Sequence, residues 1–132
     1  MSRAAVYGLI SADLDLQLLG LDPNATFSAN ATDSPTYRPF VIIRWEDHTA
    51  TFADRGPQNL TIWVHDDGQD YARVNDMLQR IREVMADAVH VVGNDGDTLT
   101  ESRWLGSSSD LYDDGYRTIT RNATFRVVSR RS

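Results

Sequence analysis

The chain has 132 residues, no cysteine, and 13 basic against 19 acidic residues, which gives a formal net charge of −6. One domain of this size removes roughly two-thirds of its unfolded surface from water, and the lack of cysteine excludes disulfides and thiolate metal sites. The acidic balance disfavours nonspecific attraction to DNA or to anionic membranes, because such binding needs a positive surface.

The N-terminal segment favours a helix from about Arg3 to Leu19, in an apolar stretch that Asp13 and Asp15 interrupt. Because a secretion signal keeps an uninterrupted apolar stretch, we expect a cytosolic helix here instead of a signal peptide. No run in the chain approaches the roughly 18 apolar residues that a membrane-spanning helix needs.

The apolar residues of this predicted helix form two edges instead of one stripe. One edge holds Ala5, Leu9, Ala12, Leu16 and Leu19, and the other holds Ile10, Leu14, Leu18 and Leu21. Two edges need two partners, of which one is the domain's own sheet and the other a neighbouring subunit. We therefore expect Leu9 and Leu16 at a subunit interface. The alternative is a helix lodged broadly in one core, with Asp13 at its rim.

Residues 22–38 are rich in Asn, Ser, Thr, Asp and Pro and predict a long loop. The segment Phe40–Trp45 that follows is apolar on both faces, so we expect a strand inside a sheet that is covered on both sides. A second loop over residues 46–57 is too long for a tight hairpin and carries one aromatic residue, Phe52. An apolar side chain on an exposed loop makes Phe52 a candidate interface residue.

A half-buried strand and an amphipathic helix come next. In Leu60–His65, apolar and polar positions alternate with the period of two that is typical of a strand. From Tyr71 to Val89 one core-facing helical stripe is formed by Tyr71, Val74, Leu78, Ile81, Met85, Ala88 and Val89. We expect Asp66, Asp67 and Asp70, at or just before the first turn, to cap this helix.

The C-terminal part predicts a turn at residues 94–96 and two strands, Thr98–Leu105 and Tyr116–Val128, around a hairpin loop at 106–115. In the second strand, one face holds Ile119, Ala123, Phe125 and Val127, interrupted by Arg121. Trp104, Leu111 and Tyr112 join Phe52 as candidate interface residues. The alternative for each is a local anchor that folds back onto its own domain.

No pattern in the chain indicates catalysis or metal binding. His48, His65 and His90 lack the spacing of zinc ligands. Asp66, Asp67 and Asp70, like the group Asp110, Asp113 and Asp114, lack the twelve-residue calcium loop and predict solvated turns. Neither a nucleophile elbow nor a glycine-rich phosphate loop occurs. We therefore expect no enzyme, no metal and no cofactor.

Four stretches of the chain together resemble the tail terminator proteins of long-tailed, siphovirus-type actinobacteriophages. They are the N-terminal helix, PFVIIRWED at 39–47, NLTIWVHDDGQDYARVNDMLQRIREVM at 59–85 and LYDDGYRTITRNATFRVVSR at 111–130. The likeness lies in the order of the helices and strands and in short stretches of similar sequence, and it covers most of the chain. Tail-completion and neck proteins, which sit between portal and tail, have a similar element order.

The resemblance implies a single α+β domain over residues 1–132, with two helices packed on one face of a mixed, mostly antiparallel sheet of four to five strands. It also implies a homohexameric ring that caps the tail tube, ends its polymerisation and offers a surface for head–tail joining. The implied partners are further copies of the chain, the tail tube protein and a head–tail connector or neck protein, with no membrane. The resemblance further implies that genomic DNA passes through the lumen without specific binding.

This resemblance places the protein in the virion, at the head-proximal end of the tail, after assembly in the host cytoplasm. Three alternatives stay open: a tail-completion or neck connector between portal and tail, a small cytosolic binding module, and an enzyme whose site combines His48, His65 and Asp110.

Overall fold

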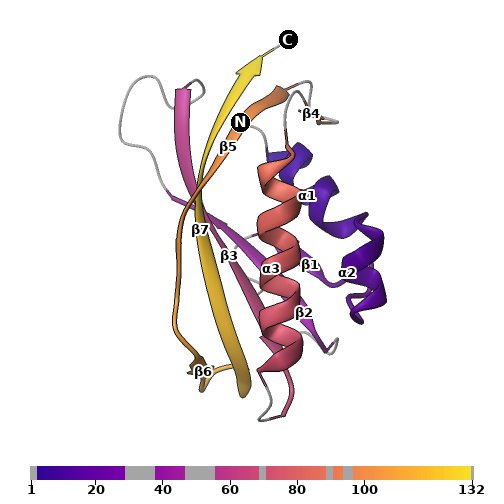
Figure 1. The fold of residues 1–132 in the computed structure, drawn as a ribbon. Coiled ribbons are helices and arrows are strands. Elements are labelled where there is room, and N and C mark those ends of the chain that lie inside the picture. The colour runs from indigo at the N-terminus through magenta and orange to yellow at the C-terminus, as the bar shows by residue number, and fades with distance from the viewer. Residues whose placement is uncertain are drawn as a thin grey trace.

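The computed structural model describes residues 3–28, 38–46, 56–68, 71–88, 91–93 and 97–131. In these residues three helices pack against one face of a curled sheet of seven strands (Figure 1). The helices and strands are α1 (Arg3–Ser11), α2 (Leu14–Leu18), β1 (Thr26–Ser28), β2 (Phe40–Trp45), β3 (Gly56–Asp66), α3 (Ala72–Ala86), β4 (Val91–Val92), β5 (Asp97–Ser107), β6 (Leu111–Asp113) and β7 (Thr118–Arg131).

The sheet has the strand order β1-β2-β3-β7-β5-β4, and β6 pairs with β7 beyond the end of β5. Only the β1–β2 pairing is parallel, which confirms the expected mixed, mostly antiparallel sheet. The expectation of four to five strands and two helices was too low. The strands that it omits, β1, β4 and β6, have three, two and three residues, which is too short to show a period of two. Two of them lie in the predicted loops 22–38 and 106–115.

The prediction of one helix from Arg3 to Leu19 was wrong, because the chain breaks at Ala12 and Asp13. Asp13 has an extended backbone, with φ −71° and ψ 119°, and its carboxylate accepts the Leu16 amide at 3.0 Å as the N-cap of α2. The break changes which residues face the core. Ile10, Leu16 and Leu21 are buried, whereas Leu14 and Leu18 are 72% and 84% exposed.

Helix α3 carries the predicted apolar stripe on its buried side. Val74, Leu78, Ile81 and Met85 are all buried. The helix ends at Ala86, so the predicted extension to Val89 was wrong, and Val89 itself lies outside the described residues.

The expected aspartate caps of α3 are absent from the described residues, since the N-cap is Tyr71 and makes no side-chain cap bond. Asp66 is instead buried at the end of β3, where it accepts two hydrogen bonds of 2.6 Å from Arg73. Asp67 pairs with Arg38 at 3.1 Å. Asp70 lies outside the described residues.

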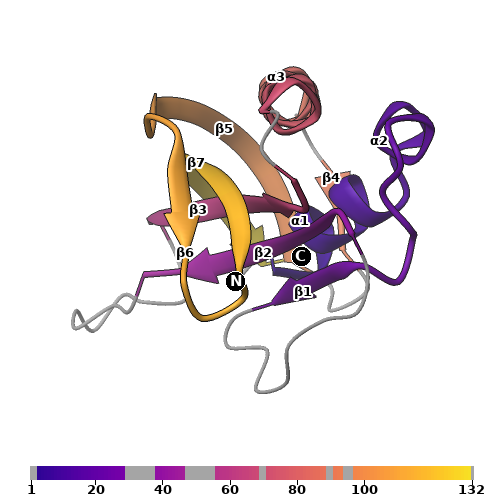
Figure 2. The same ribbon diagram turned by 90° about the horizontal axis from the view of Figure 1, so that it is seen from below.

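The two faces of the sheet differ in what covers them (Figure 2). The helix-facing side is apolar, with Leu60, Ile62 and Val64 of β3 beside Ala123 and Phe125 of β7. The other side, which we call the open face, carries no helix among the described residues. Strand β2 is buried on both faces except at Arg44, which confirms the prediction of a covered inner strand.

The described residues contain no helix long and apolar enough to cross a membrane. They also hold no group of three or more histidine, aspartate or glutamate side chains that would surround a metal ion.

Candidate functional site

Three of the six predicted interface residues are exposed, and all three lie on strands instead of loops. Trp104 on β5 is 43% exposed, and Leu111 and Tyr112 on β6 are 38% and 59% exposed. Trp104 is also a local anchor: its Nε1 donates to Ser107 Oγ at 3.1 Å, and the Arg82 guanidinium lies 3.7 Å from its ring centroid. Phe52 lies outside the described residues.

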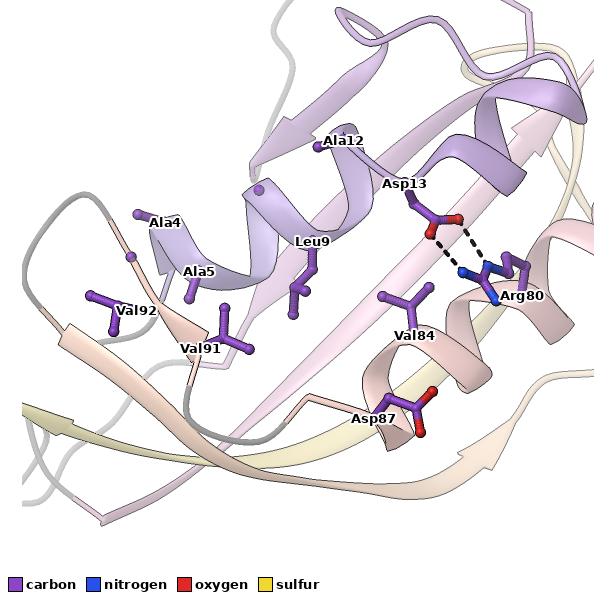
Figure 3. A pocket seen from close by; sticks show the side chains of 12 residues that line it. Ala4, Ala5, Leu9, Ala12, Asp13, Arg80, Val84, Asp87, Val91 and Val92 are labelled. Carbon is purple, nitrogen blue, oxygen red and sulfur yellow. Dashed lines mark hydrogen bonds and ion pairs between the residues drawn. The ribbon is translucent and has the colours of Figure 1, made fainter.

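The two residues predicted from the N-terminal helix have different surroundings. Leu16 is fully buried in the core, so its side chain packs within its own domain. Leu9 is half-buried and lines a cavity of about 500 Å³ between α1, α3 and β4 (Figure 3). The cavity wall is mostly small or aliphatic and includes Ala12, Val84 and Val91.

Asp13 and Arg80 close one end of this cavity (Figure 3). The guanidinium donates to the two carboxylate oxygens over 2.8 and 2.9 Å, and Asp15 and Glu83 lie 3.4 and 3.3 Å from it. The hydrogen bond from Arg80 holds the pKa of Asp13 below its ordinary value, against the effect of burial. The pair joins the start of α2 to the middle of α3.

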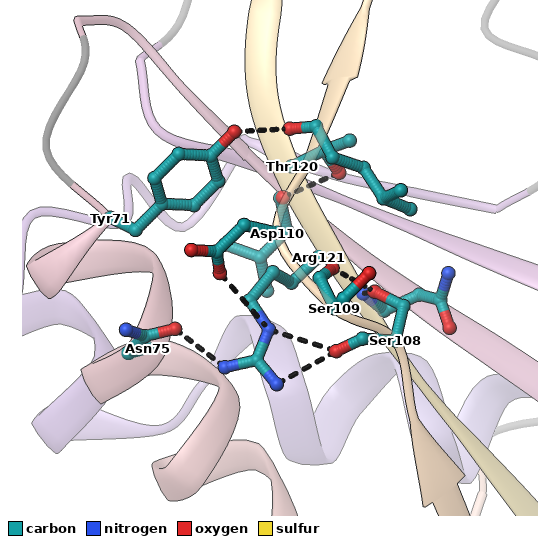
Figure 4. A network of polar contacts seen from close by, with 10 residues as sticks. Tyr71, Asn75, Ser108, Ser109, Asp110, Thr120 and Arg121 are labelled. Carbon is teal, nitrogen blue, oxygen red and sulfur yellow. Dashed lines mark hydrogen bonds and ion pairs between the residues drawn. The ribbon is translucent and has the colours of Figure 1, made fainter.

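A second polar network holds the connection between β5 and β6 against α3 (Figure 4). Arg121 donates two hydrogen bonds to the Ser108 carbonyl, at 2.8 and 3.1 Å, and a third to Asn75 Oδ1 at 2.6 Å. The Tyr71 hydroxyl donates to the Leu111 carbonyl at 2.6 Å. These bonds fix the position of β6, the strand that carries the exposed Leu111 and Tyr112. They also explain why Arg121 interrupts the apolar face of β7: its side chain holds the β5–β6 connection and α3 together.

The open face holds a second cavity of about 310 Å³, lined by Ile42, Arg44, Trp63, His65, Asp113 and Tyr116. His65 is buried; its ring is stacked on Phe40 at 4.7 Å, and its Nδ1 lies 2.8 Å from Thr118 Oγ1. Burial lowers the pKa of His65 to about 4, so the imidazole is neutral at pH 7.

Two of the three residues of the enzymatic site considered from the sequence, His65 and Asp110, lie apart in the structure. Asp110 is exposed and lies 3.7 Å from Arg121, whose side chain reaches α3 on the helix side of the sheet. His65 lies on the opposite, open face, and His48 is outside the described residues.

Leu14 and Leu18 of α2 are the most exposed large apolar side chains among the described residues. The sequence placed both on an apolar edge of one long helix but not among the interface candidates. A signal was present: aspartate directly before an apolar residue is a helix-start pattern, and a new start at Asp13 changes the helical phase. Sequence reasoning also missed the arginines of the open face, Arg44, Arg103 and Arg126, because no local pattern brings them together.

Comparison with known proteins gives a likeness in fold. No family model matches the chain, and no curated protein matches it in sequence. Among solved structures, the chain matches a protein in the "Virion of native gene transfer agent (GTA) particle" with a TM-score of 0.72 and 20% identity, over 96% of this chain and 92% of that one. The chain therefore has the fold of a component of a gene transfer agent virion.

Proposed function

We propose that this chain is a structural virion protein that forms a ring on the end of a tail tube, ends the polymerisation of the tube and provides the surface for head–tail joining. The observation that carries the proposal is the likeness in fold to a virion component across 96% of the chain. The order of the elements and short stretches of the sequence also resemble those of tail terminators. Both point to a protein that works by assembly.

The mechanism is steric. Once a ring covers the growing end of the tube, the surface that would recruit the next tube subunit is occupied. Such a protein needs a rigid scaffold and several contact surfaces. The chain presents exposed apolar side chains on three separate elements, with Leu18 on α2, Leu105 on β5 and Tyr112 on β6.

The partners of this function are further copies of the chain in a homohexameric ring, the tail tube protein and the head–tail connector. The ring lies at the head-proximal end of the tail, and genomic DNA passes through its lumen. No reaction is catalysed, and the buried, neutral His65 has a structural role in packing.

A tail-completion or neck connector between portal and tail is the second candidate. It draws support from the same observation, because the description of the matched structure covers a whole virion and gives no position within it. The two roles predict different defects, since a connector acts after the length of the tail has been set.

The test is electron microscopy of particles assembled without the chain, with particles restored by the wild-type chain as the control. A terminator predicts tails of irregular, extended length that carry no heads. Tails of normal, uniform length that stay free of heads would assign the connector role. Normal tails joined to heads would exclude both roles.

A further inference from the structure

The open-face cavity of about 310 Å³ combines apolar walls with three polar side chains. It is lined by Ile42, Arg44, Trp63, His65, Asp113 and Tyr116. Small-molecule sites have volumes of roughly 300–1,000 Å³, mostly apolar walls and a few polar groups that fix the ligand. The cavity has this composition, and the proposed ring function assigns nothing to it.

Aromatic rings form most of the apolar wall. Phe40, His65 and Trp63 make a row of nearly parallel rings, with angles of 5° between Phe40 and His65 and 24° between His65 and Trp63. The Tyr116 ring stands across this row, at 71° to His65. Trp63 and Tyr116 are half-buried and line the cavity, so part of each side chain is open to an occupant. Such a wall favours a flat aromatic group, which stacks on it.

His65 supplies a polar atom that lacks a partner. The side chain is only 2% exposed, and its Nδ1 lies 2.8 Å from Thr118 Oγ1. The other ring nitrogen, Nε2, makes no hydrogen bond within the described part of the chain, and protein atoms do not fully enclose it. Because His65 lines the cavity, Nε2 meets the space inside it. An occupant with a polar edge satisfies this atom, which accepts or donates according to its tautomer.

Two side chains of opposite charge complete the cavity. Arg44 is exposed and makes no ion pair or hydrogen bond with any described residue, the nearby Glu46 included. Asp113 is half-buried, and its Oδ1 accepts the Tyr116 amide at 2.8 Å. An occupant that uses both side chains offers acceptors to a guanidinium and donors to a carboxylate. A simple anion or cation matches only one of the two.

Among flat groups of this size, the guanine base has the required edge. Its O6 and N7 are adjacent acceptors, to which arginine binds in a bidentate manner. Beside them, N1–H and the N2 amino group are donors that one carboxylate accepts together. Adenine carries an amino group in place of O6 and has no N1–H, so it would meet a guanidinium with a donor. Cytosine and thymine offer one ring fewer for stacking.

We propose that the open-face cavity binds a guanine base, which stacks on Trp63, directs O6 and N7 to Arg44 and directs N1–H and the N2 amino group to Asp113. His65 Nε2 binds a further polar atom of the same ligand. The base comes from a free nucleotide or from an unpaired position in a DNA strand, because pairing in a duplex covers its donors. This site is independent of the proposed ring function, which the tail-length test decides by itself.

Isothermal titration calorimetry with the four deoxynucleoside monophosphates tests the proposal, since all four carry the same phosphate and differ only in the base. The wild-type chain should bind dGMP saturably and should bind dAMP, dCMP and dTMP at least about tenfold more weakly. Inorganic phosphate should not bind. Equal binding of the four nucleotides, or binding of phosphate alone, would show attraction of an anion and overturn the inference. Absence of saturable dGMP binding at millimolar concentration would overturn it as well.

The variants Arg44→Gln and Asp113→Asn test the two charged contacts, with Arg126→Gln and Asp114→Asn as matched controls. Arg44 and Arg126 are both exposed on the open face, but only Arg44 lines the cavity. Asp113→Asn keeps an oxygen that accepts the Tyr116 amide. Each test variant should bind dGMP at least about tenfold more weakly and lose its preference over dAMP, whereas each control should bind like the wild-type chain. Unchanged affinity and preference in both test variants would contradict the site.

Nuclear magnetic resonance of the wild-type chain provides a measurement that needs no variant. The signals of the His65 ring nitrogens should shift when dGMP is added, because Nε2 gains a hydrogen bond, and should stay unchanged with phosphate. If dGMP binds without moving these signals, it occupies another place on the chain and the inference fails.

Further ligands identify the source of the base and the competing occupant. Tighter binding of a short single strand with one guanine than of dGMP assigns the site to a DNA strand, and equal binding assigns it to a free nucleotide; both results support a guanine site. Equally tight binding of the matched duplex would overturn the inference. Tighter binding of L-tryptophan than of dGMP, lost in R44Q and D113N, would also overturn it, because the occupant is then an aromatic amino acid or such a side chain of a protein partner.

Discussion

His65 lies among the aromatic rings of Phe40, Trp63 and Tyr116 on the open face. Burial lowers its pKa from 6.5 to about 4. The unfolded chain therefore binds a proton between these values that the folded chain does not. Stability falls as the pH drops from about 6.5 to about 4, and it is unaffected by His65 above that range.

We predict that this residue makes the free energy of unfolding about 3 kcal/mol smaller at pH 4 than at pH 7. The carboxylates change stability in part of the same range, so the control is His65→Phe, which keeps an aromatic ring and removes the titration. Urea unfolding across the range measures both proteins. The prediction fails if the two curves of stability against pH are parallel.

The junction of α1 and α2 depends on one carboxylate with two functions. Asp13 caps α2 through the Leu16 amide and also holds Arg80 of α3. Because its pKa is lowered, the ion pair stabilises the fold above the ordinary value of 3.8. That contribution is lost as the pH falls through the lowered pKa.

Two substitutions separate these functions. Asp13→Asn keeps an oxygen that accepts the amide but removes the charge, whereas Asp13→Ala removes both. We predict that both variants are less stable than the wild-type chain and that D13A is less stable than D13N by about 1 kcal/mol. Denaturant unfolding at pH 7 measures the difference, and equal stability of the two variants would show that the cap contributes nothing.

The elements that are long enough to show a regular pattern of apolar residues were predictable from the sequence. The two apolar faces of β2 and most of the stripe of α3 follow from local spacing, because Val74, Leu78, Ile81 and Met85 are buried as expected. Strand β1 was not predictable, because three residues in a polar segment are a strand only through their parallel pairing with β2. Asp66 was expected to be a cap because only the fold buries its carboxylate and brings the exposed Arg73 to it.

The open-face arginines show why the candidate surface could not be predicted. Strand β5 shifts register between Leu99 and Glu101 and again between Trp104 and Gly106. A shift of one residue moves every following side chain to the other face, so a period of two read along β5 assigns the wrong side. Only the pairing with β7 places Arg103 beside Arg126.

The whole molecule is an acidic domain whose charge is unevenly distributed. Among the described residues, Arg73, Arg80 and Arg121 form ion pairs on the helix side, whereas Arg44, Arg103 and Arg126 on the open face form none and share that face with the exposed Glu46 and Glu101. Its exposed apolar side chains are spread over α2, β5 and β6. The ring component that we propose needs separate surfaces for its two neighbours and for the tube, and the exposed side chains on these three elements are the candidates for them.

The central claim is that copies of this chain form a ring at the end of the tail tube. Cryo-electron microscopy of the head–tail junction in intact particles tests it most directly. The account predicts six copies in one closed ring on the last layer of tube subunits. Density for the chain at any other position in the particle, or in no closed ring, would contradict it.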